Sequence, residues 1–549
     1  VNLVNQSSFL WTCVLTALIA GCTTTAPSSS NVNMPKSAAK KEMTAEAAAP
    51  SLDMGGFKLN YMTSMIVQDS FILKPEQNTA KYQHLDSNPV YSVAKTPVST
   101  FSIDVDTGSY SNVRHFLNNG HLPPADAVRA EEMINYFSYQ YKTPTDAKPF
   151  AVSSSVVDSP WKPEAKVIRI GIKGKEITTE ALPPANLVFL IDVSGSMYGE
   201  EKLGLAKHTL RLLTEQLREQ DSITLITYAS GEQVLLEATK GTQANKDKIL
   251  KAINQLEAGG STHGESAIQQ AYQSAEKSYI KGGINRILLL TDGDFNVGVT
   301  DFQTLKNMVA EKRKSGISLS TFGFGTDNYN EQLMEQIADA GDGNYSYIDT
   351  KNEAKKVLHR QLSSTLATIA QDVKIQVEFN PVTVKEYRLI GYENRLLKEE
   401  DFNNDKVDAG DIGAGHSVTA LYEIIPVGKQ GWLNESHYQQ TPTATGKNDE
   451  YAHVAIRYKL PDQSQSNLIN IPIKNKSVPF ANGDSDTQWA ITVASFAELL
   501  KGGKYSGDLD YQAVKQLAQT NKSNDSYGLK AEFIELVGIA DSLSSKKPK

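Results

Sequence analysis

Oxygen-bearing side chains gather at three points of the sequence where an apolar run or a glycine-rich loop ends. The first point is the stretch Asp192-Val-Ser-Gly-Ser196, which follows the unbroken apolar run Leu187–Ile191. The side chains of interest are Asp192, Ser194, Ser196, Thr262 and Asp292. Burying a carboxylate such as Asp192 costs several kcal/mol unless another group compensates its charge. The sequence therefore raises the question of what compensates Asp192.

We expect a hard divalent cation to compensate the charge of Asp192. The five side chains offer two carboxylates and three hydroxyls, with no cysteine and a single histidine, His263, close by. An oxygen-only set of this kind suits Mg²⁺, and also Ca²⁺ or Mn²⁺. Since Mg²⁺ prefers six oxygens and keeps some of its waters, five protein groups leave room for one outside ligand. Asp294 and Asn296 are expected to shape the rim without binding the metal, and His263 is expected to face solvent.

The elements that must position these groups alternate between strand and helix from residue 183 to about 366. Runs such as 222–228 and 286–292 predict buried strands, and amphipathic stretches such as 202–217 and 266–280 predict helices. We expect a doubly wound α/β unit with a mostly parallel sheet. Ligands bind such sheets at the carboxyl ends of the strands, where Asp192 and Asp292 stand.

Outside this unit the pattern differs. Val373, Ile375, Val377 and Phe379 alternate with polar residues, which is typical of an antiparallel sheet with one buried face. One such sheet cannot bury its apolar face alone. We therefore expect strands near 152–157 and 167–172 to join it in a β-sandwich, with the α/β unit inserted in the chain of that sandwich. Helices are expected over 110–117 and 125–137, over a segment that contains Trp489, and over 529–543.

These patterns predict six segments. In order they are a signal peptide (1–22), a flexible tether (23–75), an N-terminal helical and β region (76–182), the α/β domain (183–366), the antiparallel β-sandwich region (367–480) and a C-terminal helical region (481–549).

The N-terminus indicates export. The apolar stretch 9–20 has the length of a signal-peptide core and runs into Ile19-Ala20-Gly21-Cys22, which resembles a bacterial lipobox. In that motif the cysteine is lipidated, so Cys22 is predicted to carry a membrane anchor. Thr23, not Asp, follows Cys22, and this resemblance favours the outer membrane of a bacterial envelope.

Composition excludes some classes of function. The chain has 549 residues, 40% of them hydrophobic and 21% charged, as in a soluble globular protein. Its formal net charge of −8 gives no reason to expect a nucleic-acid partner. Apart from Cys13 and Cys22 the chain has no cysteine, so no internal disulfide is expected in the mature protein.

The combination Asp-x-Ser-x-Ser, Gly-Gly-Ser-Thr and Thr-Asp-Gly resembles the metal-ion-dependent adhesion site of von Willebrand factor type A domains. More widely, the chain is similar to the bacterial lipoprotein family labelled YfbK-like. The segments that carry this wider resemblance are Ser99–Gly108, Ala130–Tyr136, Pro184–Phe189, Asn285–Leu288, Asp292–Gly298 and Gly391–Leu396. The resemblance implies that Ser194, Ser196 and Thr262 contact the metal and that Asp192 and Asp292 act through water. It further implies that an acidic group of a partner completes the shell.

The sequence leaves three functions open. The first is a metal-dependent module that binds an acidic partner, which we expect to be a protein, and performs no catalysis. The second is a structural envelope protein whose metal only holds loops. The third is a hydrolase that uses the metal or Asp106, whose Asp106-Thr-Gly108 stretch looks like an aspartic protease loop. That chemistry needs two aspartates sharing a proton, and the chain has no second Asp-Thr-Gly. We therefore expect Asp106 or Thr107 to cap a helix instead.

Overall fold

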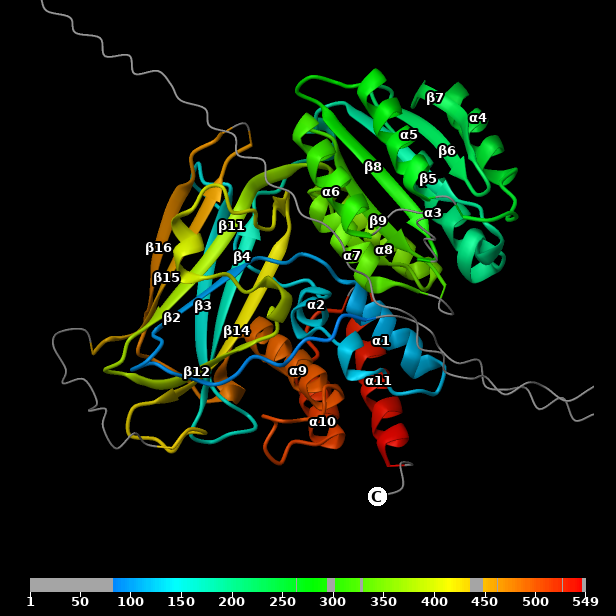
Figure 1. The fold of residues 1–549 in the computed structure, drawn as a ribbon. Coiled ribbons are helices and arrows are strands. Elements are labelled where there is room, and N and C mark those ends of the chain that lie inside the picture. Colours follow the sequence, from blue (N-terminus) through cyan, green and yellow to red (C-terminus); the bar gives the residue numbers. More distant parts are fainter. Residues whose placement is uncertain are drawn as a thin grey trace, which may run out of the picture. The chain divides into compact units, whose positions relative to one another are not determined.

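A six-stranded sheet forms the centre of the α/β unit in the computed structural model (Figure 1). Its strands, in spatial order, are β10 (Tyr345–Tyr347), β9 (Ser318–Gly323), β8 (Ile284–Thr291), β5 (Ala185–Asp192), β6 (Ser222–Tyr228) and β7 (Glu232–Lys240). Neighbours are parallel except β7, which runs antiparallel to β6. Every residue of β5 and β8 is buried, as their unbroken apolar runs predict.

Helices cover both faces of this sheet. On one face Leu187 and Phe189 belong to a cluster that includes α3 (Leu205–Gln216), α4 (Gln243–Asn254) and α8 (Lys351–Leu366). On the other face Val188 and Leu190 pack with α5 (Gly264–Lys277), α6 (Phe302–Lys312) and α7 (Glu331–Ala340). Alternate side chains of one strand thus enter two different cores, which makes the unit doubly wound as predicted.

Two antiparallel sheets form the β-sandwich. The first has the order β1 (Tyr91–Ser92), β12 (Val384–Ile390), β14 (Ser417–Pro426), β4 (Lys166–Gly174) and β3 (Phe150–Asp158). The second has the order β13 (Ile412–Gly413), β11 (Thr368–Phe379), β15 (Glu450–Lys459) and β16 (Asn467–Lys474), and β2 (Val98–Ser102) also pairs with β11. Both sheets combine strands from before and after the α/β unit, so the predicted insertion of that unit in a sandwich is confirmed.

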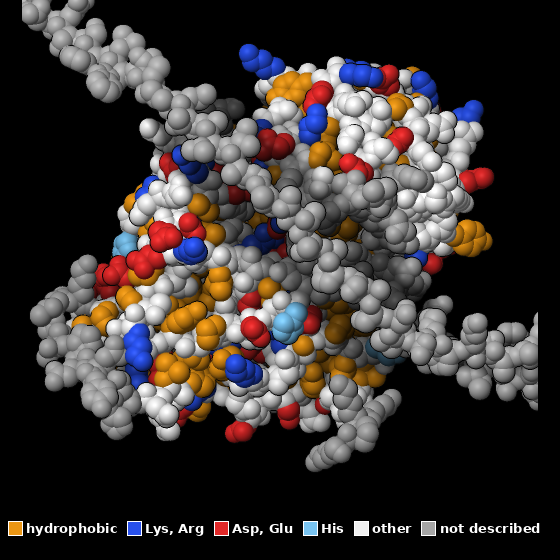
Figure 2. Space-filling model, in the orientation of Figure 1, with side chains coloured by type: hydrophobic (Ala, Val, Ile, Leu, Met, Phe, Trp, Pro, Cys, Tyr) orange, Lys and Arg blue, Asp and Glu red, His pale blue; other side chains and the backbone are white. Residues whose placement is uncertain are grey.

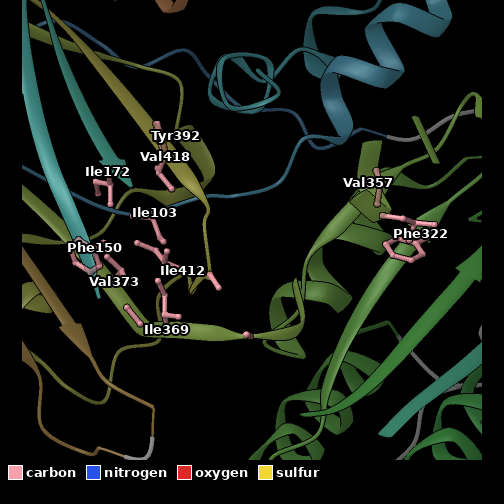
Figure 3. Close-up of a cluster of buried hydrophobic side chains, with 14 of the residues drawn as sticks. Ile103, Phe150, Ile172, Phe322, Val357, Ile369, Val373, Tyr392, Ile412 and Val418 are labelled. Carbon is pink, nitrogen blue, oxygen red and sulfur yellow. The ribbon is translucent and has the colours of Figure 1, made fainter. Parts of the chain in front are cut away.

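Apolar side chains of the two sheets meet in the sandwich core. Phe150 and Ile172 from the first sheet lie in the same buried cluster as Ile369 and Val373 from the second, as Figure 3 shows. The same cluster continues into the α/β unit, where Phe322 belongs to it.

A helical layer completes the fold. It contains α1 (Gly108–Asn118), α2 (Ala130–Asn135), α9 (Ser485–Leu500), α10 (Tyr511–Asn521) and α11 (Leu529–Ser544). Their shared core includes the fully buried rings of Tyr110, Tyr136 and Trp489. The predicted N- and C-terminal helical parts therefore pack on one another.

Two predicted helices are interrupted. The helix expected over 125–137 is a 3-10 turn (Ala125–Ala127) and the separate helix α2, because Val128 and Arg129 adopt extended backbone. The helix expected over 202–217 opens with a π turn at Glu200–Gly204, from which α3 continues. Strands β12 and β16 and helix α10 were not predicted.

The structure describes residues 82–262, 264–293, 302–325, 329–434, 448–461, 463–525 and 527–545, without the side chains of 359–366. The predicted signal peptide, Cys22 and the predicted tether lie outside these residues. In the parts of the chain just named, no helix combines the length and the apolar character needed to cross a membrane.

Candidate metal centre

The carboxyl-edge site is our name for Asp192, Ser194, Ser196, Thr262 and Asp292, the five predicted ligands. Asp192 is the last residue of β5, and Asp292 directly follows β8, the neighbouring parallel strand. Because these two strands end at the same edge of the sheet, both carboxylates lie there, as predicted.

Four of the five residues are joined by a chain of short contacts. The backbone N–H of Ser194 donates to Asp192 Oδ1 at 2.9 Å, and the hydroxyls of Ser194 and Ser196 lie 3.0 Å apart. The hydroxyl of Ser196 donates to Asp292 Oδ1 at 3.3 Å. The fold therefore places two carboxylates and two hydroxyls within reach of one small ligand.

Thr262 is positioned by its loop, not by the end of a strand. The backbone N–H of Gly195 donates to Gly260 O at 3.0 Å, and the N–H of Gly259 donates to Val193 O at 2.7 Å. These two bonds hold the loop that carries Thr262 against the loop that carries the serines. Gly260 has a φ of +88°, a backbone conformation that glycine adopts without strain.

Asp192 is held by neutral groups. Its Oδ2 accepts hydrogen bonds from the hydroxyls of Thr291, at 2.7 Å, and Tyr228, at 3.3 Å. Asp192 is fully buried, and this burial raises its pKa to about 6, although the hydrogen bonds from Ser194 and Thr291 oppose the rise. The negative charge of Asp292 adds to the rise. A divalent cation would stabilise the ionised form of Asp192, so the carboxylate environment fits a metal.

Asp292 has a cationic neighbour that the sequence patterns did not predict. The ammonium of Lys202 lies 3.2 Å from Asp292 Oδ2 and 3.0 Å from the carbonyl oxygen of Ser196. Lys202 belongs to the π turn Glu200–Gly204, and only 7% of it is exposed. One carboxylate of the site is therefore already neutralised, while Asp192 is compensated only by hydrogen-bond donors among the described residues.

Two further residues of the site were missed for different reasons. Tyr228 stands opposite Asp192 in the register of β5 and β6, so the pairing of parallel strands could have indicated it. Thr291 directly precedes Asp292 and could have been noticed as an oxygen donor. The position of Lys202 depends on the π turn, for which the sequence contains no signal that we recognise.

The donor set fits a hard cation, since it consists of carboxylates and hydroxyls only. Across the described ranges, no group of three or more His, Cys, Asp or Glu residues could hold a metal, so hydroxyls have to complete any shell. His263, Asp294 and Asn296 lie outside the described residues.

Asp106, which precedes α1, contacts distant parts of the fold. Thr107 occupies the N-cap position of α1, but its side chain makes no capping hydrogen bond, so the predicted cap is wrong. Asp106 instead accepts a hydrogen bond from the backbone N–H of Tyr345 at 2.9 Å and pairs with Arg395 at 3.2 Å. Both oxygens of Asp106 therefore tie the loop before α1 to other elements of the fold.

The doubly wound sheet with carboxylates and hydroxyls at its carboxyl edge is that of a von Willebrand factor type A domain, and the model of that domain matches residues 186–361. Two further family models match, "von Willebrand factor" at 76–169 and "Uncharacterized protein YfbK, C-terminal" at 364–543. The uncharacterised protein YfbK of Escherichia coli is 46% identical over 85% of this chain and 82% of its own length. The chain belongs to the YfbK family.

More distant similarities concern smaller parts or the fold alone. An uncharacterised protein of Synechocystis is 29% identical over 40% of this chain and half of its own. A solved von Willebrand factor type A protein from Catenulispora acidiphila is 14% identical, with a TM-score of 0.42, and the match covers 75% of this chain and 100% of that one.

Proposed function

We propose that this protein is a cell-envelope lipoprotein that binds a divalent cation at its carboxyl-edge site and, through it, an acidic group of a protein partner. The observation that carries the proposal is the chain of contacts from Asp192 through Ser194 and Ser196 to Asp292. Mg²⁺ is the expected ion, with Ca²⁺ or Mn²⁺ as substitutes. The ion would supply positive charge at the sheet edge and leave one position open for a carboxylate from outside.

Each residue of the carboxyl-edge site and its surroundings would have a separate role in binding the cation. Thr291 and Tyr228 hold the Asp192 carboxylate in one orientation, while Lys202 balances the charge of Asp292. The hydroxyls of Ser194 and Ser196 then provide neutral oxygens between the two carboxylates. Because the site would keep one net negative charge from Asp192, a divalent ion would leave it positive and attractive to a carboxylate.

A surface residue next to the site supports a macromolecular partner. Tyr198 lies two residues beyond Ser196 and is 82% exposed. Tyrosine is enriched among the residues that carry most of the binding energy at protein interfaces. A large aromatic side chain kept in solvent beside the proposed cation therefore favours a protein partner over a small ligand.

Metal binding and partner binding can be tested in turn. Tb³⁺ can replace the hard cation, and Tyr228 is close enough to sensitise its luminescence, so luminescence that Mg²⁺ displaces would report the site. Capture of partners from envelope extract is then compared with Mg²⁺, with EDTA and with Asp292→Asn. The control is Asp247→Asn, an exposed aspartate on α4. Equal capture under all conditions, with an intact fold, contradicts the proposal and leaves a structural metal as the alternative.

The membrane anchor is proposed separately, on the lipobox-like sequence that ends at Cys22. A single acyl chain anchors a protein only weakly, so we expect more than one chain on Cys22. Cys22→Ser should move the protein from the membrane fraction to the soluble fraction. A variant that stays as firmly bound as the wild type would show that Cys22 is not the anchor.

A further inference from the structure

At the opposite end of the parallel sheet, the buried Arg286 has no charged partner among the described residues. Arg286 is the third residue of β8 and is 4% exposed. Its Nη1 donates to the hydroxyl of Ser320 at 2.7 Å, and its Nε has no hydrogen-bond partner in the part of the chain that the structure describes. No carboxylate of the described residues lies within ion-pair distance of it. A guanidinium in this situation is costly, because buried charges normally pair.

Arg286 lines a cavity of about 330 Å³ that we call the amino-edge cavity. Its charged lining residues are Asp104, Asp106, Asp339, Asp342, Asp408 and Asp411 together with Arg286, Lys306, Arg313 and Arg395. Leu396, which is 46% exposed, also lines it, so the cavity reaches the surface. This volume lies at the lower end of the range for small-molecule sites.

Most of these charges are already paired. Arg313 pairs with Asp342 and Asp408. Arg395 pairs with Asp104, Asp106 and Asp339, so, within the described ranges, only one of the six aspartates has no arginine partner. The exception is Asp411, which accepts one hydrogen bond, from the backbone N–H of Asp372 at 3.2 Å. Among the described residues, Lys306 and Asp411 have no ion-pair partner, like Arg286.

The described lining side chains without an ion-pair partner include two basic residues, Arg286 and Lys306, and one acidic residue, Asp411. Burial lowers the pKa of Arg286 to about 10, and the nearby charges of Asp411 and Asp342 only partly oppose this. Burial also raises the pKa of Asp411 well above its usual range, so the ionised forms of both groups are penalised and each would be stabilised by an opposite charge in the cavity. The side-chain oxygen of Asn394, another lining residue, also has no hydrogen-bond partner within the described ranges. The cavity thus offers donors for an anion at Arg286 and Lys306, and acceptors for a cation at Asp411 and Asn394.

We infer that the amino-edge cavity binds a small zwitterion with one carboxylate and one ammonium group, the chemistry of a free amino acid or dipeptide. The carboxylate pairs with Arg286, and the ammonium is accepted by Asp411 and Asn394. A polyanion such as phosphate fits poorly, because six aspartates against four basic residues leave the lining with an excess of negative charge. A zwitterion satisfies both leftover groups and adds no net charge.

This site is independent of the carboxyl-edge site. Asp192 ends β5 one residue beyond Ile191, which is in register with Leu290 of β8. Arg286 stands near the start of β8. About five residues of strand separate the two levels, or roughly 16 Å at 3.3 Å per residue. Zwitterion binding is therefore expected to persist in EDTA, and its failure would not affect the proposed function.

Calorimetric titration of the full chain tests the inference. The probes are alanine and dialanine as zwitterions, propionate and ethylammonium as half-ligands, and inorganic phosphate. We expect a zwitterion to bind at least about tenfold more tightly than either half-ligand, because each half loses a charge-assisted contact. Absence of zwitterion binding at millimolar concentration, or equal binding of propionate or phosphate, overturns the inference.

Substitutions of the lining residues test whether the zwitterion binds in the amino-edge cavity. Arg286→Met and Asp411→Asn should each weaken zwitterion binding about tenfold to hundredfold. The matched control is Arg211→Met, because Arg211 likewise donates to a neutral side chain, Asn254, but lies half-buried on α3 and does not line the cavity. Arg286→Met removes a costly buried charge, so circular dichroism should show a folded protein. Asp411→Asn provides a second test if that variant does not fold. Unchanged binding in a folded variant of either residue contradicts the inference.

Discussion

The two edges of the parallel sheet contain buried charges of opposite sign with different surroundings. At the carboxyl edge, Asp192 is held by the donors of Ser194, Thr291 and Tyr228 and lies beside a second carboxylate. At the amino edge, Arg286 has one neutral partner, Ser320, and faces a cavity lined by both signs. The first edge has an excess of hard oxygen ligands and suits a cation, whereas the second leaves single unpaired groups of both signs and suits a zwitterion.

Elsewhere in the fold, the buried charge of Arg114 is compensated by several ion pairs. Arg114 of α1 pairs with Asp349, Glu353 and Glu532 at 2.5, 2.7 and 2.9 Å. These acidic residues belong to the segment after β10, to α8 and to α11, so one guanidinium ties the α/β unit to the helical layer. These ion pairs give Arg114 a structural role that Arg286, which has no ion pair among the described residues, does not share.

The largest expected effect comes from breaking a paired charge. Arg114→Met leaves three carboxylates with less compensation, two of them buried, and should lower the free energy of unfolding by about 3–5 kcal/mol. Arg286→Met should leave the free energy of unfolding unchanged or raise it, because this substitution breaks no ion pair among the described residues. Denaturant unfolding of both variants measures the contrast. Similar destabilisation by the two substitutions would show that Arg286 is also compensated in the native protein.

The next effect concerns the carboxyl edge. Asp192→Asn keeps the size of the side chain but removes the charge that a cation would meet, so Tb³⁺ affinity should fall by about 100-fold or more, equivalent to roughly 2.7 kcal/mol. The fold should persist, because the amide oxygen can still accept from the Ser194 N–H while the amide NH₂ donates to the hydroxyl oxygen of Thr291. Luminescence titration measures the affinity. Tb³⁺ affinity equal to that of the wild type would place the cation elsewhere.

The free energy of unfolding should depend on pH because of Glu335, a buried residue near the amino edge. Burial raises the pKa of Glu335 on α7 to about 8; Arg129 and Arg395 oppose this rise, and Asp339 and Glu331 add to it. Between the unfolded pKa of 4.5 and about 8, the folded state holds a proton that the unfolded state has released. Stability should therefore fall as pH rises through this range, by on the order of 1–2 kcal/mol.

Glu335→Gln isolates this effect. The amide cannot ionise, so the midpoint of denaturant unfolding should change less between about pH 5 and about pH 8.5 than in the wild type. Glu311→Gln, an exposed glutamate on α6, serves as the control and should leave the pH dependence unchanged. The prediction fails if the wild type is more stable at the higher pH.

The smallest effect tests the ammonium beside Asp292. Lys202→Met removes a positive charge that would compete with the cation, so Tb³⁺ affinity should rise by about tenfold. Lys207→Met is a suitable control, because Lys207 lies five residues further along and donates to the carbonyl oxygen of Asn254 instead. Weaker Tb³⁺ binding in Lys202→Met would mean that Lys202 helps to assemble the site.

Several elements of the fold could be predicted because their signal is local. The unbroken apolar run 187–191 indicates a strand buried on both faces, and the alternation at 373–379 indicates a strand with one buried face. Strand β16 escaped prediction because most of its residues are exposed or half-buried on both faces, which leaves no long apolar run. The helix expected over 125–137 failed at Arg129, whose side chain pairs with Glu335 of α7 at 2.6 Å. Such a distant contact leaves no local trace in the sequence.

The sequence by itself determined which oxygen ligands exist and at which strand ends they stand, because strand direction and the alternation of helices follow from hydrophobic periodicity. It therefore predicted that Asp192, Ser194, Ser196 and Asp292 share one edge of the sheet. Only the tertiary structure decided which charges remain unpaired. Lys202 reaches Asp292 through a π turn, and Arg286 is left with Ser320 alone because no acidic side chain of the described residues comes within ion-pair distance. Pairing depends on the distance between side chains far apart in the chain, and no local pattern encodes that distance.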